Sequence, residues 1–281
     1  MSGKSKKSGY RKPKPVFAKK SFGQNFLVDR NYISKIISAL NPKEGERIIE
    51  IGSGRGALTE ELLASGAEVK AVELERDMIA VLREKFDGRE NFQLIESDAL
   101  KVDFRELARN SESENSNSKA KLVANLPYYI STAILQKLIE EREAFSEMVL
   151  MFQREVVERI TARAGDSERG FLTVLTEAFL KTEKLFDVPP SAFRPAPKVW
   201  SAVVRLVPKN ESFIEDEELF RTLASAAFKQ KRKTIFNNLK ASNIAADWTE
   251  TLRAAQVEPG RRAESLSLDE WRRIISAVRS T

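Results

Sequence analysis

The sequence predicts an α/β fold in which a parallel, doubly wound sheet is followed by a small all-helical domain. Between residues 47 and 152, short apolar runs alternate with segments of helical apolar spacing, which is typical of a parallel sheet with helices on both faces. From about residue 209 onward only helical spacing remains. We therefore divide the chain into a basic tail (residues 1–20), an α/β domain (21–208) and a helical domain (209–281).

The elements of the α/β domain are bounded by glycine-rich or polar turns. Residues 21–27 mix aromatic and amide side chains and are expected to form a lid or a packed segment. The polar stretch 110–119 predicts a solvated surface loop, and the proline-rich stretch 188–198 excludes regular structure. In chain order we expect helix 31–40, strand 47–51, helix 57–64, strand 69–72, helix 77–86, strand 92–95, strand 122–124, helix 131–139, strand 148–152, helix 155–162, helix 171–180 and strand 201–207.

The helical domain is expected to contain helices at residues 217–228, 231–239, 248–255 and 268–278. Basic side chains gather near the start of its second helix, with Phe228 and Phe236 among them. This pattern predicts an RNA-contacting surface, and its basic residues are Lys229, Lys231, Arg232, Lys233 and Lys240. The alternative is a solvated helix face whose aromatic rings pack in the core.

Composition excludes several kinds of chemistry. The chain has no cysteine and no histidine, which excludes disulfides, thiolate nucleophiles, histidine bases and histidine-based zinc sites. No apolar run approaches the roughly 18 residues of a membrane span, and the N-terminus lacks an apolar signal region. We expect a cytoplasmic protein with no metal site and no membrane partner.

The net charge of +6 originates in the N-terminal tail. Residues 1–20 contain eight lysine or arginine residues and no acid, which leaves 39 basic and 41 acidic residues in the rest of the chain. A flexible cationic arm is typical of nucleic-acid binding. The alternative is a solvated terminus without a partner.

The four residues Asn125-Leu126-Pro127-Tyr128 follow the strand expected at 122–124. Pro127 lacks an N–H and disfavours helical backbone at Leu126, so the chain turns where open α/β sheets bind ligands. The amide oxygen of Asn125 and the carbonyl of Leu126 can accept from an exocyclic amine, and Tyr128 offers a flat face to a base. The corner is therefore a candidate adenine clamp. The alternative is a strand-end turn in which Asn125 bonds local backbone and Tyr128 packs in the core.

A second candidate site begins at Gly52-Ser53-Gly54-Arg55-Gly56-Ala57, between an expected strand and helix. Read as G-x-G-x-x-A, it would cradle a dinucleotide pyrophosphate, with Glu73 on the ribose. Read as G-x-G-x-G, it would close with Gly52 and Gly54 over S-adenosylmethionine, which has no phosphate. Asp98, at the end of the third strand, favours the second reading, because a further carboxylate is unfavourable near a pyrophosphate and tolerable near a sulfonium. The alternative for Asp98 is a helix N-cap.

Taken together, these motifs resemble the family of ribosomal RNA small-subunit adenine dimethyltransferases, the KsgA type, from about residue 20 to residue 275. Each motif alone is weak, but their number and order are specific. The matching segments are residues 22–27 (FGQNFL), 50–54 (EIGSG), Glu73, Asp98, 125–128 (NLPY), 153–157 (QREVV), 188–193 (VPPSAF), 228–234 (FKQKRKT) and 262–267 (RAESLS).

The resemblance implies a Rossmann-like methyltransferase domain and dimethylation at N6 of two adjacent adenosines in the 3′-terminal hairpin of 16S rRNA. It implies a monomer that acts on immature 30S particles and has a role in small-subunit biogenesis. In that family the positions matching Asn25, Leu27, Gly52, Glu73, Asp98 and Asn125 bind S-adenosylmethionine.

The chain departs from the family pattern at three places. Ser53 stands where a proline is usual, Arg169 replaces a common tyrosine, and residues 110–119 resemble an insertion. None of these touches the expected acceptor pair, but Arg169 is expected to alter substrate contact.

The expected mechanism is direct displacement, with adenine N6 attacking the sulfonium methyl carbon. Asn125 and Leu126 would orient the amine, while Tyr128 and Phe193 would stack on the flipped base. The competing functions are a 23S rRNA adenine methyltransferase of the macrolide-resistance type, a DNA adenine methyltransferase, and a ribosome-assembly factor that acts chiefly by binding.

Overall fold

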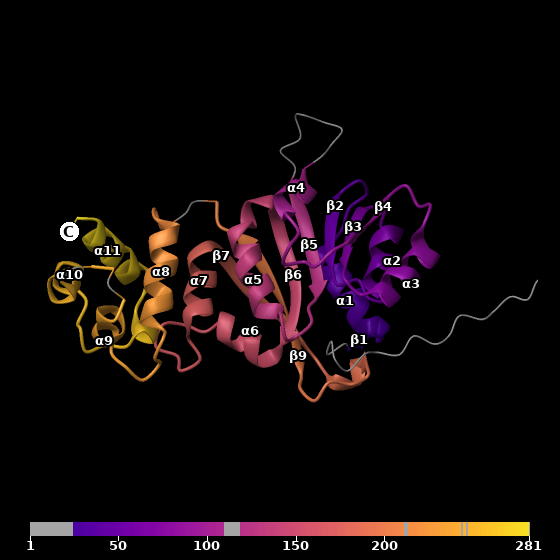
Figure 1. Ribbon diagram of the computed structural model, residues 1–281. Helices are drawn as coiled ribbons and strands as arrows, with labels where there is room; N and C mark the ends of the chain where they lie inside the picture. The colour runs from indigo at the N-terminus through magenta and orange to yellow at the C-terminus, as the bar shows by residue number, and fades with distance from the viewer. Residues whose placement is uncertain (1–24, 110–118, 211–212, 243, 246, 281) are drawn as a thin grey trace, which may run out of the picture.

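The computed structural model describes residues 25–109, 119–210, 213–242, 244–245 and 247–280 (Figure 1). The expectations for the tail at residues 1–20 and for nearly all of the loop at 110–119 lie outside these residues. Within the described part, no helix combines the length and apolarity that crossing a membrane requires. Nor do three or more carboxylates gather there in a group able to hold a metal ion.

A seven-stranded sheet forms the centre of the molecule and confirms the α/β class. Its strand order is β4-β3-β2-β5-β6-β9-β7. The first five strands in this order are parallel, and β9 and β7 are antiparallel to their neighbours. The strands are β2 (Arg47–Ile51), β3 (Glu68–Glu73), β4 (Phe92–Glu96), β5 (Ala120–Asn125), β6 (Phe145–Gln153), β7 (Leu180–Val188) and β9 (Ser201–Pro208).

Helices cover both faces of this sheet because successive strand residues point to opposite sides. Ile48, Val123 and Val149 pack in one cluster with helices α1 and α2, whereas Ile49, Leu122 and Leu150 pack in a second cluster with α5 and α7. The helices of this domain are α1 (Arg30–Leu40), α2 (Ala57–Ala64), α3 (Arg76–Phe86), α4 (Phe104–Ala108), α5 (Ser131–Glu140), α6 (Arg154–Ile160) and α7 (Phe171–Phe179).

Three strands form beyond the expected set. β7 occupies the edge of the main sheet, and its sequence LKTEKLFDV carries charges at four of nine positions, so it lacks the apolar run of a buried strand. β1 (Phe26–Leu27) pairs antiparallel with β8 (Phe193–Arg194). This pairing joins the segment before α1 to the proline-rich connection and lays both beside the carboxyl edge of the sheet. The expectation that residues 188–198 exclude regular structure is therefore wrong, since a 3-10 turn at Pro190–Ala192 and the short strand β8 form there.

The helical domain follows as α8 (Glu217–Ala227), α9 (Ile235–Lys240), α10 (Trp248–Ala254) and α11 (Leu268–Arg279). The expectation of a helix from residue 231 is wrong for residues 231–234, because α9 begins only after Thr234, whose hydroxyl accepts from the N–H of Asn237 at 3.3 Å. The core of this domain is continuous with that of the sheet: Phe179 of α7 and Phe220 of α8 meet edge to face at 5.9 Å.

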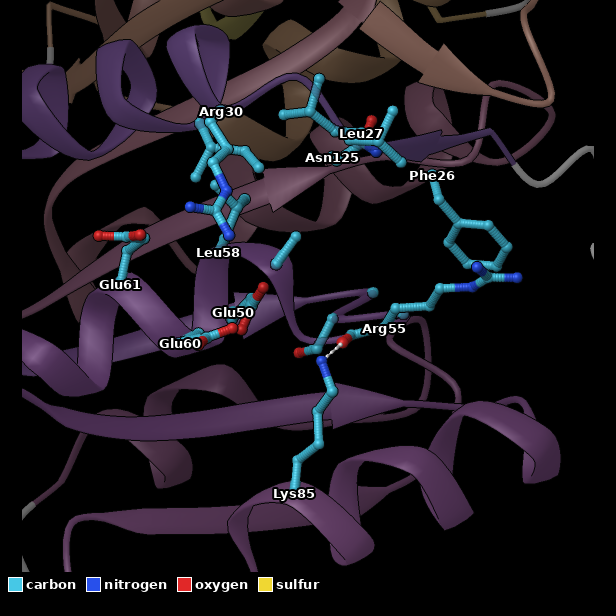
Figure 2. A pocket seen from close by; sticks show the side chains of 16 residues that line it. Phe26, Leu27, Arg30, Glu50, Arg55, Leu58, Glu60, Glu61, Lys85 and Asn125 are labelled. Carbon is cyan, nitrogen blue, oxygen red and sulfur yellow. Dashed lines mark hydrogen bonds between the residues drawn. The ribbon is translucent and has the colours of Figure 1, made fainter. Parts of the chain in front are cut away.

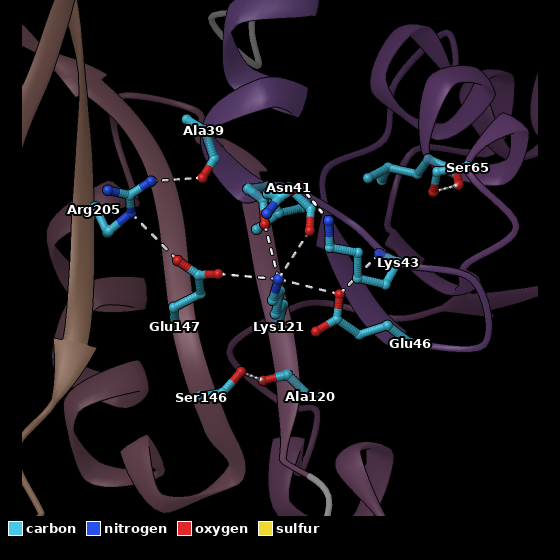
Figure 3. A network of polar contacts seen from close by, with 12 residues as sticks. Ala39, Asn41, Lys43, Glu46, Ser65, Ala120, Lys121, Ser146, Glu147 and Arg205 are labelled. Carbon is cyan, nitrogen blue, oxygen red and sulfur yellow. Dashed lines mark hydrogen bonds and ion pairs between the residues drawn. The ribbon is translucent and has the colours of Figure 1, made fainter.

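A partly buried polar network fixes α1 against the sheet at the end remote from the carboxyl edge (Figure 3). Lys121, near the start of β5, donates to the carbonyls of Leu40 and Asn41 at 3.0 and 3.1 Å. It also pairs with Glu46 and Glu147 at 3.1 and 3.2 Å. A cation at the C-terminus of a helix is favourable because the last carbonyls lack helical partners. The network thereby orients α1 and the β1 segment that precedes it.

Candidate functional site

The carboxyl ends of four adjacent parallel strands carry the candidate residues. β2 runs into Gly52, β3 ends at Glu73, Asp98 follows β4, and β5 ends at Asn125. Because parallel strands end on the same edge, these groups share one crevice. Two cavities of about 440 and 370 Å³ lie there, and both are lined by Gly52. A smaller cavity of about 80 Å³ is lined by Gly52, Glu73 and the whole Asn125–Tyr128 corner.

The glycine turn after β2 adopts backbone angles that suit glycine. Gly52 and Gly54 have φ angles of +71° and +54°, in the left-handed region that side chains disfavour. A Cβ added at Gly54 would lie 3.2 Å from the ring of Phe26. β1 therefore closes over the turn, and the Arg55 guanidinium lies 4.7 Å from the centre of the same ring (Figure 2). The stretch at residues 25–27 is thus a packed cover of the site.

Glu73 is buried and is held by three backbone N–H groups. One carboxylate oxygen accepts from Gly54 at 2.9 Å, and the other accepts from Leu74 and Glu75, each at 2.9 Å. These bonds fix the carboxylate between the glycine turn and the larger cavity. Each oxygen keeps acceptor capacity for a hydroxyl, which suits a ribose.

Asp98 lines the larger cavity together with Glu73, Pro127 and Tyr129. One of its carboxylate oxygens accepts from the N–H of Leu100 at 3.0 Å. This resembles the capping alternative, but no helix follows, because residues 99 and 100 form only a turn. The cavity also has apolar walls of Ile51, Val72 and Ile134, so it combines apolar surface for a flat ring with a carboxylate acceptor at its rim.

The Asn125 corner is oriented by contacts at each of its residues. The Asn125 side-chain nitrogen donates to the carbonyl of Asn25 at 3.3 Å, so the amide oxygen points away from Asn25. The Leu126 N–H donates to Met151 of β6 at 3.3 Å, and the Pro127 carbonyl accepts from Ile130 at 3.2 Å. The backbone at Leu126 and Pro127 therefore makes local contacts, as the strand-end-turn alternative expected. Asn125 itself lines the cavities of about 370 and 80 Å³ but not the one of about 440 Å³.

The two predicted stacking residues are placed differently. Tyr128 is half-buried, and its hydroxyl lies 2.7 Å from that of Ser201. Burial raises the pKa of the Tyr128 phenol, and the bond to Ser201 offsets this in part. Phe193 is fully buried in the core on the α1 side of the sheet. Stacking by Phe193 on a base would require its ring to become uncovered, so for Phe193 stacking stays a prediction.

Glu50 is a candidate residue that sequence reasoning did not select. It lies in β2 among isoleucines, is 2% exposed and lines the cavity of about 370 Å³ (Figure 2). Burial raises the pKa of its carboxyl to about 7. The hydrogen bond from the Thr59 hydroxyl at 2.6 Å and the nearby Ser53 hydroxyl lower the pKa, and the charge of Glu73 raises it. In the sequence, a lone carboxylate within an apolar strand is the pattern that could have identified Glu50, because such groups are rarely buried without a role.

The predicted RNA-contacting residues Lys229, Lys231, Arg232 and Lys233 are all exposed. They lie in the turn between α8 and α9 rather than on a helix face, which corrects the expectation. Lys231 donates to the carbonyl of Ser167 at 2.6 Å. Phe228 and Phe236 pack against the core, as the alternative for the aromatic rings expected.

Arg169 is buried, with 1% of its surface exposed, so its expected effect on substrate contact could only be indirect and stays a prediction. Its guanidinium donates to the carbonyl of Leu266 at 3.1 Å and pairs with Glu177 of α7 at 2.6 Å. It therefore joins the helical domain to the α/β domain.

Comparisons with known proteins agree with this geometry. The family model for ribosomal RNA adenine dimethylase matches residues 17–279. Ribosomal RNA small subunit methyltransferase A of Hahella chejuensis is 44% identical over 263 residues, which cover 93% of this chain and 93% of the relative. The protein of the same name from Pseudomonas aeruginosa is 42% identical over 263 residues, which cover 93% of this chain and 94% of the relative.

Two solved structures extend the likeness to the fold. A dimethyladenosine transferase from Plasmodium falciparum has a TM-score of 0.75 at 28% identity, covering 90% of this chain and 97% of that one. The 23S rRNA methyltransferase ErmE has a TM-score of 0.66 at 26% identity, covering 91% and 100%. The match of the family model over nearly the whole chain, with the glycine turn and the Asn125 corner at one sheet edge, shows that the chain belongs to the ribosomal RNA adenine dimethylase family.

Proposed function

We propose that the chain transfers methyl groups from S-adenosylmethionine to N6 of two adjacent adenosines in the 3′-terminal hairpin of 16S rRNA. The observation that carries the proposal is the position of Asn125, which shares a small cavity with the glycine turn and Glu73. The names of the curated relatives support the small-subunit substrate. The family model supports adenine dimethylation.

The residues at the sheet edge fit S-adenosylmethionine. The larger cavity would take the nucleoside, with the Glu73 carboxylate on the ribose hydroxyls and Asp98 accepting from the adenine amine. The other large cavity would take the amino-acid end beside Leu27, Gly52 and Gly54, with Asn25 in the adjoining small cavity. The Glu73 carboxylate favours a cation beside the glycine turn, and a bound cation would in turn favour the ionised form of Glu50. When bound, the cofactor supplies the electrophilic methyl carbon.

The Asn125 corner would hold the target amine. The amide oxygen of Asn125 and the Leu126 carbonyl are fixed acceptors that orient the N6 lone pair and stabilise the positive charge that N6 gains as it attacks. The half-buried ring of Tyr128 would stack on the flipped adenine, and its bond to Ser201 holds the ring in place. Pro127 fixes the turn that presents both acceptors. A chain without histidine or cysteine relies on positioning and electrostatics rather than on a tuned base.

Binding to the rRNA would use the exposed turn of Lys229, Lys231, Arg232 and Lys233 beside α9. We further propose that the protein acts as a cytoplasmic monomer on immature 30S particles, and that the helical domain positions the adenosines at the corner. The sequence's cationic tail at residues 1–20 would add non-specific phosphate contacts.

Mass mapping of rRNA tests the proposal. Small subunits lacking the modification are incubated with purified protein and S-adenosylmethionine, and the 16S rRNA is digested and sequenced by mass. We expect a mass increase equivalent to two methyl groups on each of two adjacent adenosines. Large subunits and duplex DNA are run in parallel. Modification of 23S rRNA alone would favour the ErmE-like alternative, and modification of duplex DNA alone would refute an RNA substrate.

A further inference from the structure

Trp200 is an exposed tryptophan beside the candidate site. The chain has three tryptophans; Trp248 and Trp271 are 4% and 0% exposed, whereas Trp200 is 46% exposed. Isolated exposed apolar side chains are common, but an indole has a large apolar surface to leave in water. The position of Trp200 therefore needs an explanation.

The backbone contacts of Trp200 place it at the mouth of the base-binding corner. Its carbonyl accepts from the N–H of Arg154 at 2.9 Å, at the end of β6. The next residue, Ser201, starts β9 and holds the hydroxyl of Tyr128 at 2.7 Å. The connection that carries Trp200 projects from the sheet beside β1 (Figure 1). A base held on Tyr128 would thus have its neighbouring nucleotides near Trp200.

The segment around Trp200 is cationic. Arg194 and Lys198 are exposed, and no acidic residue occurs between Val188 and Asn210. Arg194 is anchored by donating to the carbonyls of Ser191 and Phe193 at 3.1 and 2.8 Å. An aromatic ring flanked by cations is the arrangement with which proteins bind unpaired nucleotides: the ring stacks on a base while the cations contact phosphates.

We propose that Trp200 stacks on an unpaired nucleobase that flanks the target adenosine, and so positions that adenosine over the Asn125 corner. The inference rests on the proposed RNA substrate and deepens it by naming a second stacking platform. Trp200 is a substrate-contacting residue in this proposal, and the chemical step is left to Asn125 and Leu126.

Tryptophan fluorescence tests the contact without any methyl transfer. A hairpin RNA with the 3′-terminal 16S sequence is added until the anisotropy of a labelled copy reaches a plateau, and quenching of tryptophan emission by acrylamide is compared with and without RNA. In the wild type, we expect RNA to quench the emission of Trp200 and to shield this side chain from acrylamide. We expect neither effect in Trp200→Phe, whose remaining tryptophans are buried. Unchanged acrylamide access to Trp200 at the plateau would refute the stacking.

Steady-state kinetics on small subunits tests the consequence. Trp200→Ala is expected to raise KM for the RNA by about 5- to 150-fold, the range typical of lost base stacking, with the affinity for S-adenosylmethionine unchanged. Trp200→Phe keeps a ring and should recover most of the loss. An unchanged KM in Trp200→Ala would also refute the proposal.

Val199→Ala is the matched control, because Val199 is 44% exposed and adjacent. We expect it to leave KM near the wild-type value, and an equal rise in both variants would overturn the assignment to the indole ring. Wild-type protein that methylates no small-subunit rRNA would instead refute the proposed function, while the fluorescence comparison would still report on Trp200. The two failures are therefore distinguishable.

Discussion

At the scale of single residues, the site depends on polar groups whose positions are fixed before any ligand binds. Glu73 is held by three N–H donors, and Asn125 is oriented by Asn25. Sequence patterns located both residues, because they end apolar strands. They did not select Glu50, whose importance depends on burial and on the neighbours Thr59 and Ser53, nor did they show that Phe193 is covered. Both facts arise from tertiary packing.

Asn125→Ala is expected to lower kcat for methyl transfer by at least about 10²-fold, because it removes one of two fixed acceptors for the amine. Cofactor binding should weaken but stay measurable by calorimetry, since Gly52, Glu73 and Asp98 remain. Asn31→Ala, which removes an exposed amide from α1, serves as the control and should keep wild-type turnover. Wild-type turnover in Asn125→Ala would exclude the proposed role.

Glu50→Gln is expected to raise the free energy of unfolding of the ligand-free protein above the wild-type value at pH 8, and to raise it much less at pH 5. Burial raises the pKa of Glu50 from 4.5 to about 7, so as pH rises through this interval the unfolded chain loses its proton first and the wild type loses stability. The loss in the free energy of unfolding reaches roughly 3 kcal/mol above pH 7. Glutamine does not ionise, so the variant does not lose stability in this way. Urea unfolding of both proteins at each pH measures the effect. A difference between the two proteins that does not change with pH would contradict it.

At the scale of elements, apolar periodicity located every strand from β2 to β6, because each reads as an apolar run. β2 and β5 are largely buried on both faces, whereas β4 lies at the sheet edge and is only half-buried. It missed β7, whose charges face water at the sheet edge, and the short β1–β8 pair, which forms only through contact between distant segments. It also extended α9 into residues 231–234, where basic residues with good helix propensity occupy a turn. Propensity could not reveal that Thr234 caps the helix.

The basic turn before α9 predicts salt-dependent RNA binding. Changing Lys229, Arg232 and Lys233 to glutamine should raise KM for small subunits with little effect on kcat. If the three cations contact phosphates, the slope of log affinity against log salt should fall in magnitude by about 0.7 to 0.9 per lost contact. Filter binding of the RNA at several salt concentrations measures this slope.

The matched control removes three exposed cations from the α/β domain, Lys43, Arg83 and Arg89. It lowers the net charge equally and should leave the salt slope nearly unchanged. Equal loss in both triple variants would mean that total charge, rather than this turn, governs binding.

At the scale of the whole molecule, the helical domain is attached through both apolar and polar contacts. The core passes from Phe179 to Phe220 without interruption. Residues 163–170 add three polar links: Gly165 N–H to the Glu264 carbonyl at 3.0 Å, the Ser167 carbonyl to Lys231, and Arg169 to Leu266. The change from alternating to purely helical patterning predicts a boundary near residue 209, but it could not indicate how closely the two parts pack.

Arg169 is a buried charge in this junction, and its removal tests how firmly the helical domain is attached. Arg169→Ala leaves the Leu266 carbonyl and the Glu177 carboxylate without their cation. Because the Glu177 side chain is 40% exposed, water replaces part of the lost interaction, so urea unfolding should show a loss below the roughly 3 to 5 kcal/mol typical of a fully buried pair. If the junction also orients bound RNA, KM for small subunits should rise more than the affinity for S-adenosylmethionine falls.

Arg253→Ala is the control for Arg169→Ala, because Arg253 also pairs with a glutamate, Glu250, but in an exposed position. It should leave the urea midpoint unchanged, since water screens and replaces an exposed ion pair. Arg169→Lys keeps the charge but loses the guanidinium fork that reaches two partners at once, so an intermediate stability is expected. Wild-type stability in Arg169→Ala would show that the apolar contact of Phe179 with Phe220 holds the helical domain without help from the buried cation.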